Sequence, residues 1–276
     1  MAGSVGTMVR TTWRWLLDDQ RAVKIVLGLL LSVDAALGLI HIVVMAAWDA
    51  PDIWRVDMDG SYGEAYQYAK YLWLLILLVL YARHERRWPL LAWVPLVAYF
   101  MFDDSLLIHE RIGHWYATQS WAFGFGPLHA QSLGELATIA VLGVVLVAII
   151  AIGYVRADTR TRWIFRVLIA LTVVLLVFAV FLDAVHGLFE DVRLIDRSLG
   201  FFEDFGEMIV LTFMVVFAFR INVSGGLPGF AAQDTTQIDG ADAAQGAVGD
   251  ATADAARGTE GDEPPAATRQ SLRQGR

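Results

Sequence analysis

The sequence predicts an all-α, polytopic membrane bundle of six transmembrane helices. The chain has 276 residues, of which 57% are hydrophobic, and its mean hydropathy is +0.51. These values are typical of membrane proteins. Long apolar runs such as LWLLILLVL at 72–80 lack the alternation of a barrel strand. Because a single strand leaves its backbone groups without partners in lipid, helices are the expected spanning elements.

Six segments have close to the roughly 20 residues that a helix needs to cross about 30 Å of hydrocarbon. They are 23–47, 64–82, 88–108, 133–154, 163–182 and 201–219, which together form one domain at 23–220. The third contains Pro95, which predicts a kink inside that helix. Residues 1–22 are expected to form a cytoplasmic N-terminal segment. Residues 221–276 are rich in Ala, Gly and Asp, which predicts a disordered cytoplasmic tail.

The distribution of Lys and Arg predicts the orientation of the bundle. Basic residues gather at one set of helix ends, which predicts that both termini are cytoplasmic. No basic stripe carries interleaved aromatic residues, so nucleic acid is excluded as a partner and the lipid bilayer is the expected one. The basic side has Arg10, Arg14, Arg21, Lys24, Arg83, Arg86, Arg87, Arg156, Arg160, Arg162, Arg166 and Arg220; the other has Arg55, Lys70, Arg111, Arg193 and Arg197.

Carboxylates and histidines gather at the outer ends of the predicted spans. A charge in hydrocarbon costs several kcal/mol unless it is paired, hydrated or bound to an ion, so these residues form the candidate site. They belong to the first, third, fifth and sixth spans, and the predicted orientation puts them at one depth. They are His41, Asp103, Asp104, His109, Glu110, Asp183, His186, Glu203, Asp204 and Glu207.

The residue types in this cluster favour a divalent metal ion. Asp183 and His186 form a D-x-x-H step, which resembles the Glu-x-x-His element of di-metal helical bundles. The chain has no cysteine, so a metal must be held by nitrogen and oxygen, which suits zinc or iron. The expected metal ligands are Asp103, Asp104, His109, Asp183, His186, Glu203 and Glu207, with Glu110 or Glu207 as the catalytic base.

Several of these residues also have structural interpretations. Glu203 lies in a first helical turn, where the helix dipole stabilises an acid. Asp34 and His41 are seven residues apart on one helix face, and His41 could be a core histidine bonded to Asp34. Glu135 follows Ser132 in an S-x-x-E capping box. A network of structural ion pairs is therefore the main competitor to a metal site.

Three segments resemble a group of uncharacterised bacterial multi-pass membrane proteins. They are YFMFDDSLLIHERIG at 99–113, FLDAVH at 181–186 and FFEDFGEMIVL at 201–211. The resemblance covers about 25–220 and implies the architecture and the shared acidic and histidine positions, but no activity. It also makes the bacterial inner (plasma) membrane the expected location. In outline only, the chain is also similar to the alkaline ceramidase group of membrane hydrolases, whose H-x-x-x-H near the C-terminal end it lacks.

The sequence therefore favours a metal-dependent membrane enzyme, either a hydrolase or a di-metal oxidoreductase, acting on a lipid-like or periplasmic-side substrate. Metal-bound water with a spare carboxylate as base would serve a hydrolase. One alternative is a proton- or cation-coupled transporter, for which Asp34 is the only acid deep in a span. Against transport, the inner half offers no matching polar relay. The other alternative is a non-enzymatic accessory protein.

Overall fold

The computed structural model describes residues 5–18, 20–46, 51–125, 129–182 and 193–224. All of these residues lie in the first of two units, Met1–Pro228 and Gly229–Arg276. The expected tail at 221–276 therefore lies outside the described residues, except for its first four.

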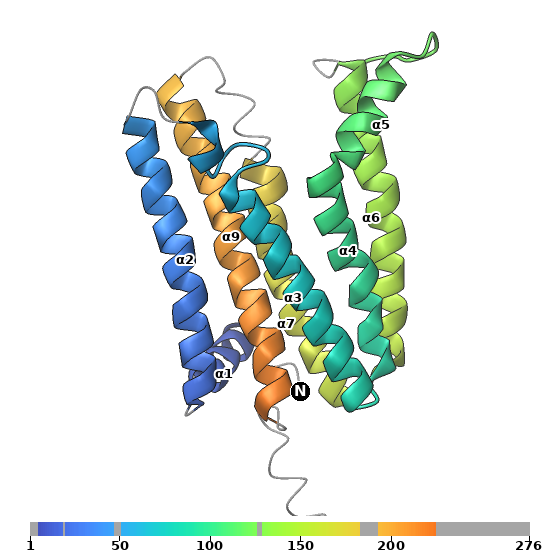
Figure 1. The fold of residues 1–276 in the computed structure, drawn as a ribbon. Helices are drawn as coiled ribbons and strands as arrows, with labels where there is room; N and C mark the ends of the chain where they lie inside the picture. Colours follow the sequence, from blue (N-terminus) through green and yellow to red (C-terminus); the bar gives the residue numbers. More distant parts are fainter. Residues whose placement is uncertain (1–4, 19, 47–50, 126–128, 183–192, 225–276) are drawn as a thin grey trace, which may run out of the picture. The chain divides into compact units, whose positions relative to one another are not determined.

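Every regular element in the described part of the chain is a helix (Figure 1). The α-helices are α1 Val5–Leu17, α2 Arg21–Ala46, α3 Tyr62–His84, α4 Trp93–Leu106, α5 Ile108–Ala117, α6 Ala130–Arg156, α7 Thr159–Leu176 and α9 Arg193–Ser224. Two short 3₁₀ helices, η1 Asp52–Trp54 and η2 Trp88–Ala92, precede α3 and α4. A π-helical turn, η3 Val177–Leu182, continues α7.

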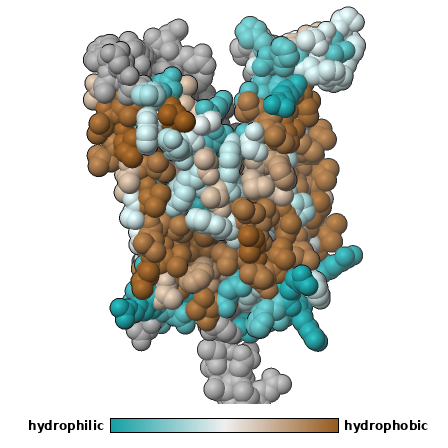
Figure 2. All heavy atoms as spheres, viewed as in Figure 1, coloured by the Kyte–Doolittle hydropathy of each residue, from teal (hydrophilic) through white to brown (hydrophobic). Residues whose placement is uncertain are grey.

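Five of these helical segments are long and apolar enough to cross a membrane, and a sixth span results if one bent helix pair is counted. The five are Arg21–Ala46, Tyr62–His84, Ala130–Arg156, Thr159–Ala179 and Ser198–Val223. On the visible face, hydrophobic residues lie on both sides of a paler band that runs down the middle, and hydrophilic residues gather at the lower edge (Figure 2). Within the described residues, the prediction of an all-helical chain is confirmed, and five or six helices have the length and apolar character to cross a membrane.

The third expected span differs from the prediction because it is bent by 60°. The helix over 88–108 breaks at Leu107, whose backbone is left-handed with φ 50° and ψ 48°. The chain then continues as α5, which packs against α6. Pro95 lies in the first turn of α4, where its missing N–H costs no helical bond. The bend therefore falls at the other end of the helix from the expected kink.

Helix α9 is the centre of the described bundle. It packs against α2, α3 and α7, and 61% of its apolar span is buried, compared with 11% for α6. Gly38 allows the contact between α2 and α9, because a Cβ there would lie 2.7 Å from the Phe205 ring. Gly113 and Gly134 do the same where α5 crosses α6, since a Cβ on Gly134 would lie 2.9 Å from the Gly113 Cα.

An ion pair ties the loop after α3 to the start of α7. Arg87 donates to Asp158 over 2.7 Å and to the Thr161 hydroxyl over 3.0 Å. Asp158 also caps α7 by accepting the Thr161 N–H. Burial acts to raise the pKa of Asp158, but the hydrogen bonds from Thr161 and Arg87 outweigh it, so the pKa lies below its ordinary value.

Candidate functional site

A buried charged pair lies where α2, α3 and α9 meet. Asp34 of α2 and Lys70 of α3 have no exposed side-chain surface, and the Lys70 Nζ lies 2.6 Å from the Asp34 Oδ1. The second carboxylate oxygen accepts a hydrogen bond of 2.7 Å from the Thr212 hydroxyl of α9. Lys70 also donates to the Met208 carbonyl over 2.7 Å, and its ammonium lies 4.2 Å from the centre of the Tyr66 ring.

Every charged atom of this pair has a polar or aromatic partner. Each Asp34 oxygen accepts one hydrogen bond, and the Lys70 ammonium has a carboxylate, a carbonyl and an aromatic face around it. Two charges without water are stable only when their geometry and remaining hydrogen bonds are good, and this arrangement meets that condition. The network also joins α2, α3 and α9 at one point.

His41 lies near the end of α2, beside the loop that precedes α3, and we call this end of the bundle its outer end. Its ring is buried and stacks on Phe201 of α9, with centroids 4.7 Å apart. The Val56 N–H donates to the His41 Nδ1 over 3.0 Å, so that nitrogen carries no proton and the ring is a neutral acceptor. His41 is thus buried and hydrogen-bonded, but to Val56 and not to Asp34.

Asp57 lies beside His41 and forms an ion pair with Arg55 of the same loop. Its carboxylate is 3.5 Å from the His41 Nδ1, and it accepts two hydrogen bonds from Arg55, of 3.0 and 2.7 Å. The hydrogen bond to Asp57 raises the pKa of Arg55 above its ordinary value, in spite of partial burial. The loop at 51–61 is therefore held over the outer end of the bundle.

Asp103 and His109 form a pair at the break between α4 and α5. The Asp103 Oδ1 accepts the backbone N–H of His109 over 3.0 Å, and its Oδ2 lies 2.9 Å from the His109 Nδ1. The carboxylate thus supplies the cap that Leu107 cannot give to the first turn of α5. A carboxylate is unfavourable at the end of α4, but the break places Asp103 at a helix N-terminus, where the dipole favours it.

The other acids converge from α3, α4, α9 and the loop before α3. Asp104 interacts electrostatically with Glu64 and Asp59. Asp204 interacts with Asp104, and its backbone carbonyl accepts a hydrogen bond of 3.3 Å from the Gln67 amide. All except Asp59 are only partly exposed. We call Glu64, Asp104, Glu203, Asp204 and Glu207 the outer acidic cluster.

Two tyrosines of α3 lie between the outer acidic cluster and the level of the charged pair. The Tyr68 hydroxyl donates to the Glu64 carboxylate. Tyr71 is buried next to Lys70 in the chain and interacts electrostatically with Glu207 and Asp104. Polar groups therefore extend from the outer end of α3 inward to the level of Lys70.

The opposite side of the charged pair is apolar. The next inward turns of α3 and α9 contribute side chains with almost no exposed surface. They are Leu74, Leu78, Leu211, Met214 and Val215. The described polar groups near the pair therefore open toward one end of the bundle only.

Several expected site residues are not brought together. Within the residues that the structure describes, no group of three or more His, Asp or Glu side chains is arranged to hold a metal ion. Asp183 and His186 lie outside the described residues. Glu110 is exposed on α5. The capping box expected at Glu135 is absent, because α6 begins earlier, at Ala130, and Glu135 instead accepts a hydrogen bond from Gln131.

The sequence analysis missed the partner of Asp34. Lys70 was counted among the few basic residues of the outer side, although it is the ninth residue of α3, which begins at Tyr62. A lysine inside an apolar span requires a counter-charge, and Asp34 was the one acid at comparable depth. That pattern could have identified the pair. Nothing comparable in the sequence indicates Thr212 or the Val56 N–H.

Comparison with known proteins gives one match. A family model described as Domain of unknown function (DUF8692) matches residues 60–221. The matched region includes Lys70, Thr212 and the outer acidic cluster, whereas Asp34 and His41 precede it. No curated protein and no solved structure matches the chain.

Proposed function

We propose a function from the geometry of the site, because the chain belongs to the DUF8692 family and the description of that family names no activity. The proposed function is the transport of protons across the membrane. The Asp34–Lys70 pair carries the proposal, because fully buried ionisable side chains within apolar spans are typical of ion and proton pathways.

The outer acidic cluster is the entrance of the proposed pathway. Its carboxylates attract a proton and pass it toward Lys70 along Tyr68 and Tyr71. A proton that reaches Asp34 neutralises the carboxylate and removes its attraction for the Lys70 ammonium. Since this pair joins α2 and α3 to α9, its loss frees the helices to move. The apolar layer at Leu74 and Leu211 is the closed gate on the other side.

The proposed orientation puts both termini in the cytoplasm. Exposed arginines at the ends of α3 and α6, including Arg83, Arg86 and Arg156, support it, because basic residues favour the cytoplasmic side. The outer acidic cluster then faces the periplasm of a bacterial plasma membrane, and the transporter draws protons from that side.

Proton flux in liposomes tests this proposal. The full chain is reconstituted with an enclosed pH dye, and an acid pulse is applied outside. We expect acidification that is faster than in empty liposomes and that falls at least about tenfold in Asp34→Asn, because the carboxylate is the proton acceptor. Asp158→Asn, an acid outside the site, is the matched control. Wild-type flux equal to that of empty liposomes, or an unchanged Asp34→Asn, overturns the proposal.

A second candidate is the metal-dependent membrane enzyme, which one contact favours. Asp103 engages the Nδ1 of His109, and a histidine held in this way by a carboxylate presents its other nitrogen to a metal. Asp104 is adjacent in sequence, and Asp183, His186, Glu203 and Glu207 would complete the ligands of zinc or iron. Glu110 or Glu207 would serve as the base toward a lipid-like or periplasmic-side substrate.

Metal analysis of the detergent-purified protein tests this candidate. The wild type is expected to hold zinc or iron in a fixed ratio, and His109→Ala to lose it. His84→Ala removes an exposed histidine at the end of α3 and is expected to retain the metal. A metal-free wild type contradicts the enzyme candidate.

A further inference from the structure

Helix α1 is amphipathic and lies before the first spanning helix. Arg10 and Arg14 are exposed one turn apart, whereas Leu16 is 5% exposed. At 100° per residue, the arginines occupy one side of the helix and Leu16 the other. The polar side of α1 is therefore turned away from the bundle.

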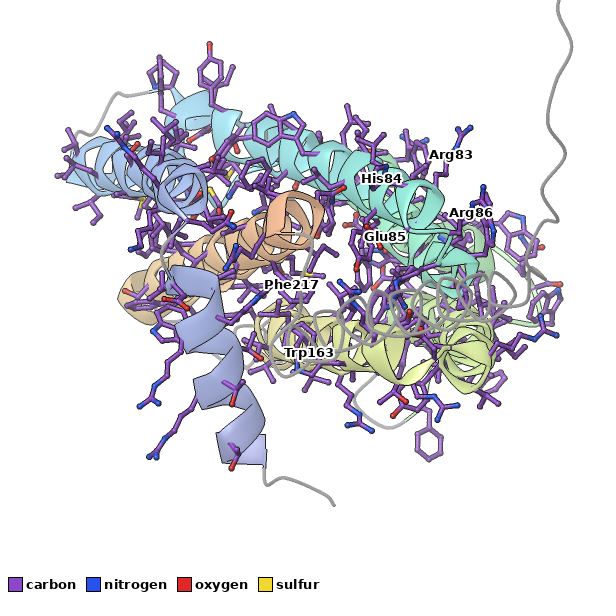
Figure 3. All side chains as sticks on the ribbon, turned by 90° about the horizontal axis from the view of Figure 1, so that it is seen from below. Arg83, His84, Glu85, Arg86, Trp163 and Phe217 are labelled. Carbon is purple, nitrogen blue, oxygen red and sulfur yellow. The ribbon has the colours of Figure 1, made fainter. Side chains whose placement is uncertain are left out.

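Trp15 fixes α1 to the ends of α7 and α9. Its ring meets Trp163 of α7 edge-on, with centroids 5.4 Å apart, and lies 6.1 Å from Phe217 of α9. The Arg220 guanidinium lies 4.8 Å from the same ring, and its Nε donates to the Trp15 carbonyl over 3.2 Å. Figure 3 shows Trp163 and Phe217 close together at this end of the bundle, with α1 seen from the side. The C-terminal end of α1 is thus attached to the bundle through Trp15.

The surface of the neighbouring helices puts α1 at the level where lipid begins. On α2, exposed apolar side chains begin at Ile25, which is 50% exposed, and continue with Leu29 at 62%. Trp13 of α1 contacts Phe213 of α9 at 5.7 Å and is still 49% exposed. An indole that is partly exposed beside an apolar helix surface is typical of the membrane–water interface.

We propose that α1 lies in the membrane–water interface at the end of the bundle where α2 begins, and that Arg10 and Arg14 bind the headgroups of anionic phospholipids. Charge complementarity carries this choice, because the exposed side of α1 is basic and Arg21 and Lys24 add exposed positive charge at the start of α2. Interfacial helices combine an inserted aromatic side with a basic side facing the headgroups. The inference goes beyond the proposed transport and does not depend on it.

A spin label on α1 tests the proposal. The chain has no cysteine, so Thr11→Cys, an exposed position, gives a single labelling site. The full protein is placed in nanodiscs of POPC or of POPC with one quarter POPG, and collisions of the label with oxygen and with a neutral nickel chelate are compared. We expect the label to be more shielded from the chelate when POPG is present. Two arginines are expected to shift the equilibrium between the lipid-bound and the unbound position of α1 by about 30-fold, which is about fivefold for each arginine.

The control separates local binding from general charge. Arg10→Gln with Arg14→Gln is expected to remove the effect of POPG, whereas Arg83→Gln with Arg86→Gln, which removes the same charge at the end of α3, is expected to keep it (Figure 3). All four arginine side chains are exposed in the wild type, so both double variants are expected to fold. A thermal melt checks this. Equal shielding in both lipids, or equal loss in both double variants, overturns the proposal.

Discussion

Replacing Lys70 by methionine tests how much of the bundle's stability depends on the central charged pair. Lys70→Met keeps an unbranched, flexible side chain that is one atom shorter, and it leaves the Asp34 Oδ1 without its partner at 2.6 Å. Only the Thr212 hydroxyl then remains bonded to the carboxylate. Because both side chains have no exposed surface, water cannot replace the ammonium.

The expected loss is large for a single substitution. Removing one partner of a buried ion pair costs about 3–5 kcal/mol, since an uncompensated charge stays in the interior. Replacing both partners by apolar residues of similar volume is often neutral or stabilising by about 1–4 kcal/mol. We therefore expect Lys70→Met to be strongly destabilised and Asp34→Leu with Lys70→Met to recover most of the loss.

Denaturant titration of the purified protein in detergent, followed by circular dichroism, measures this series. Asp34→Leu alone completes the double-mutant cycle, and the coupling free energy is read from the four proteins. If Lys70→Met lowers the free energy of unfolding by less than about 1 kcal/mol, the pair is not desolvated and the reasoning is refuted. A double variant as unstable as the sum of the single variants refutes it as well.

The double variant also distinguishes a structural pair from a functional one. If the pair serves stability alone, the refolded double variant retains the activity of the wild type. If protons pass through Asp34, the double variant is folded and transports nothing. The same liposome assay that tests the proposed function reads out this difference.

Three further predictions concern the helix ends and crossings. Asp103→Ala removes the cap of α5 and is expected to cost about 1 kcal/mol in the free energy of unfolding, whereas Asp103→Asn retains the acceptor; thermal melts compare them. Gly134→Leu is expected to cost about 1–3 kcal/mol by forcing α5 from α6, whereas Gly143→Leu, with open space around it, is expected to be neutral in the same melts. The depressed pKa of Asp158 adds stability that is present above the unfolded pKa of about 3.9 and is lost as pH falls below it, so Asp158→Asn is expected to weaken the acid dependence of unfolding. A pH dependence unchanged by that substitution would show that the bond to Arg87 contributes nothing.

Hydropathy was sufficient to predict the spanning helices, because the length and apolar character of each span are local properties of the sequence. It was not sufficient for the third span. The break at Leu107 depends on the Asp103 carboxylate folding over the break to bond the His109 N–H, and on α5 packing through Gly113 against α6. These contacts form between segments and leave no periodic signal.

The candidate site was predicted in part for a similar reason. The sequence indicates that acids at the ends of α4 and α9 share one end of the bundle, and the interaction of Asp104 with Asp204 agrees with that. Which residue faces Asp34 depends on the rotation of α2 and α3 about their axes, and the sequence does not give that angle. The sequence therefore showed that Lys70 is charged, but not that it pairs with Asp34.

The position of α9 in the chain has a consequence for biogenesis. Asp34 and Lys70 emerge from the ribosome more than a hundred residues before Met208 and Thr212, which complete their shell of contacts. Each charge would cost about 2.5–3.5 kcal/mol on entering the bilayer alone. Helices α2 and α3 are therefore expected to enter lipid together, as a hairpin in which Asp34 and Lys70 form an ion pair. Helix α9 packs against this hairpin once it has been synthesised.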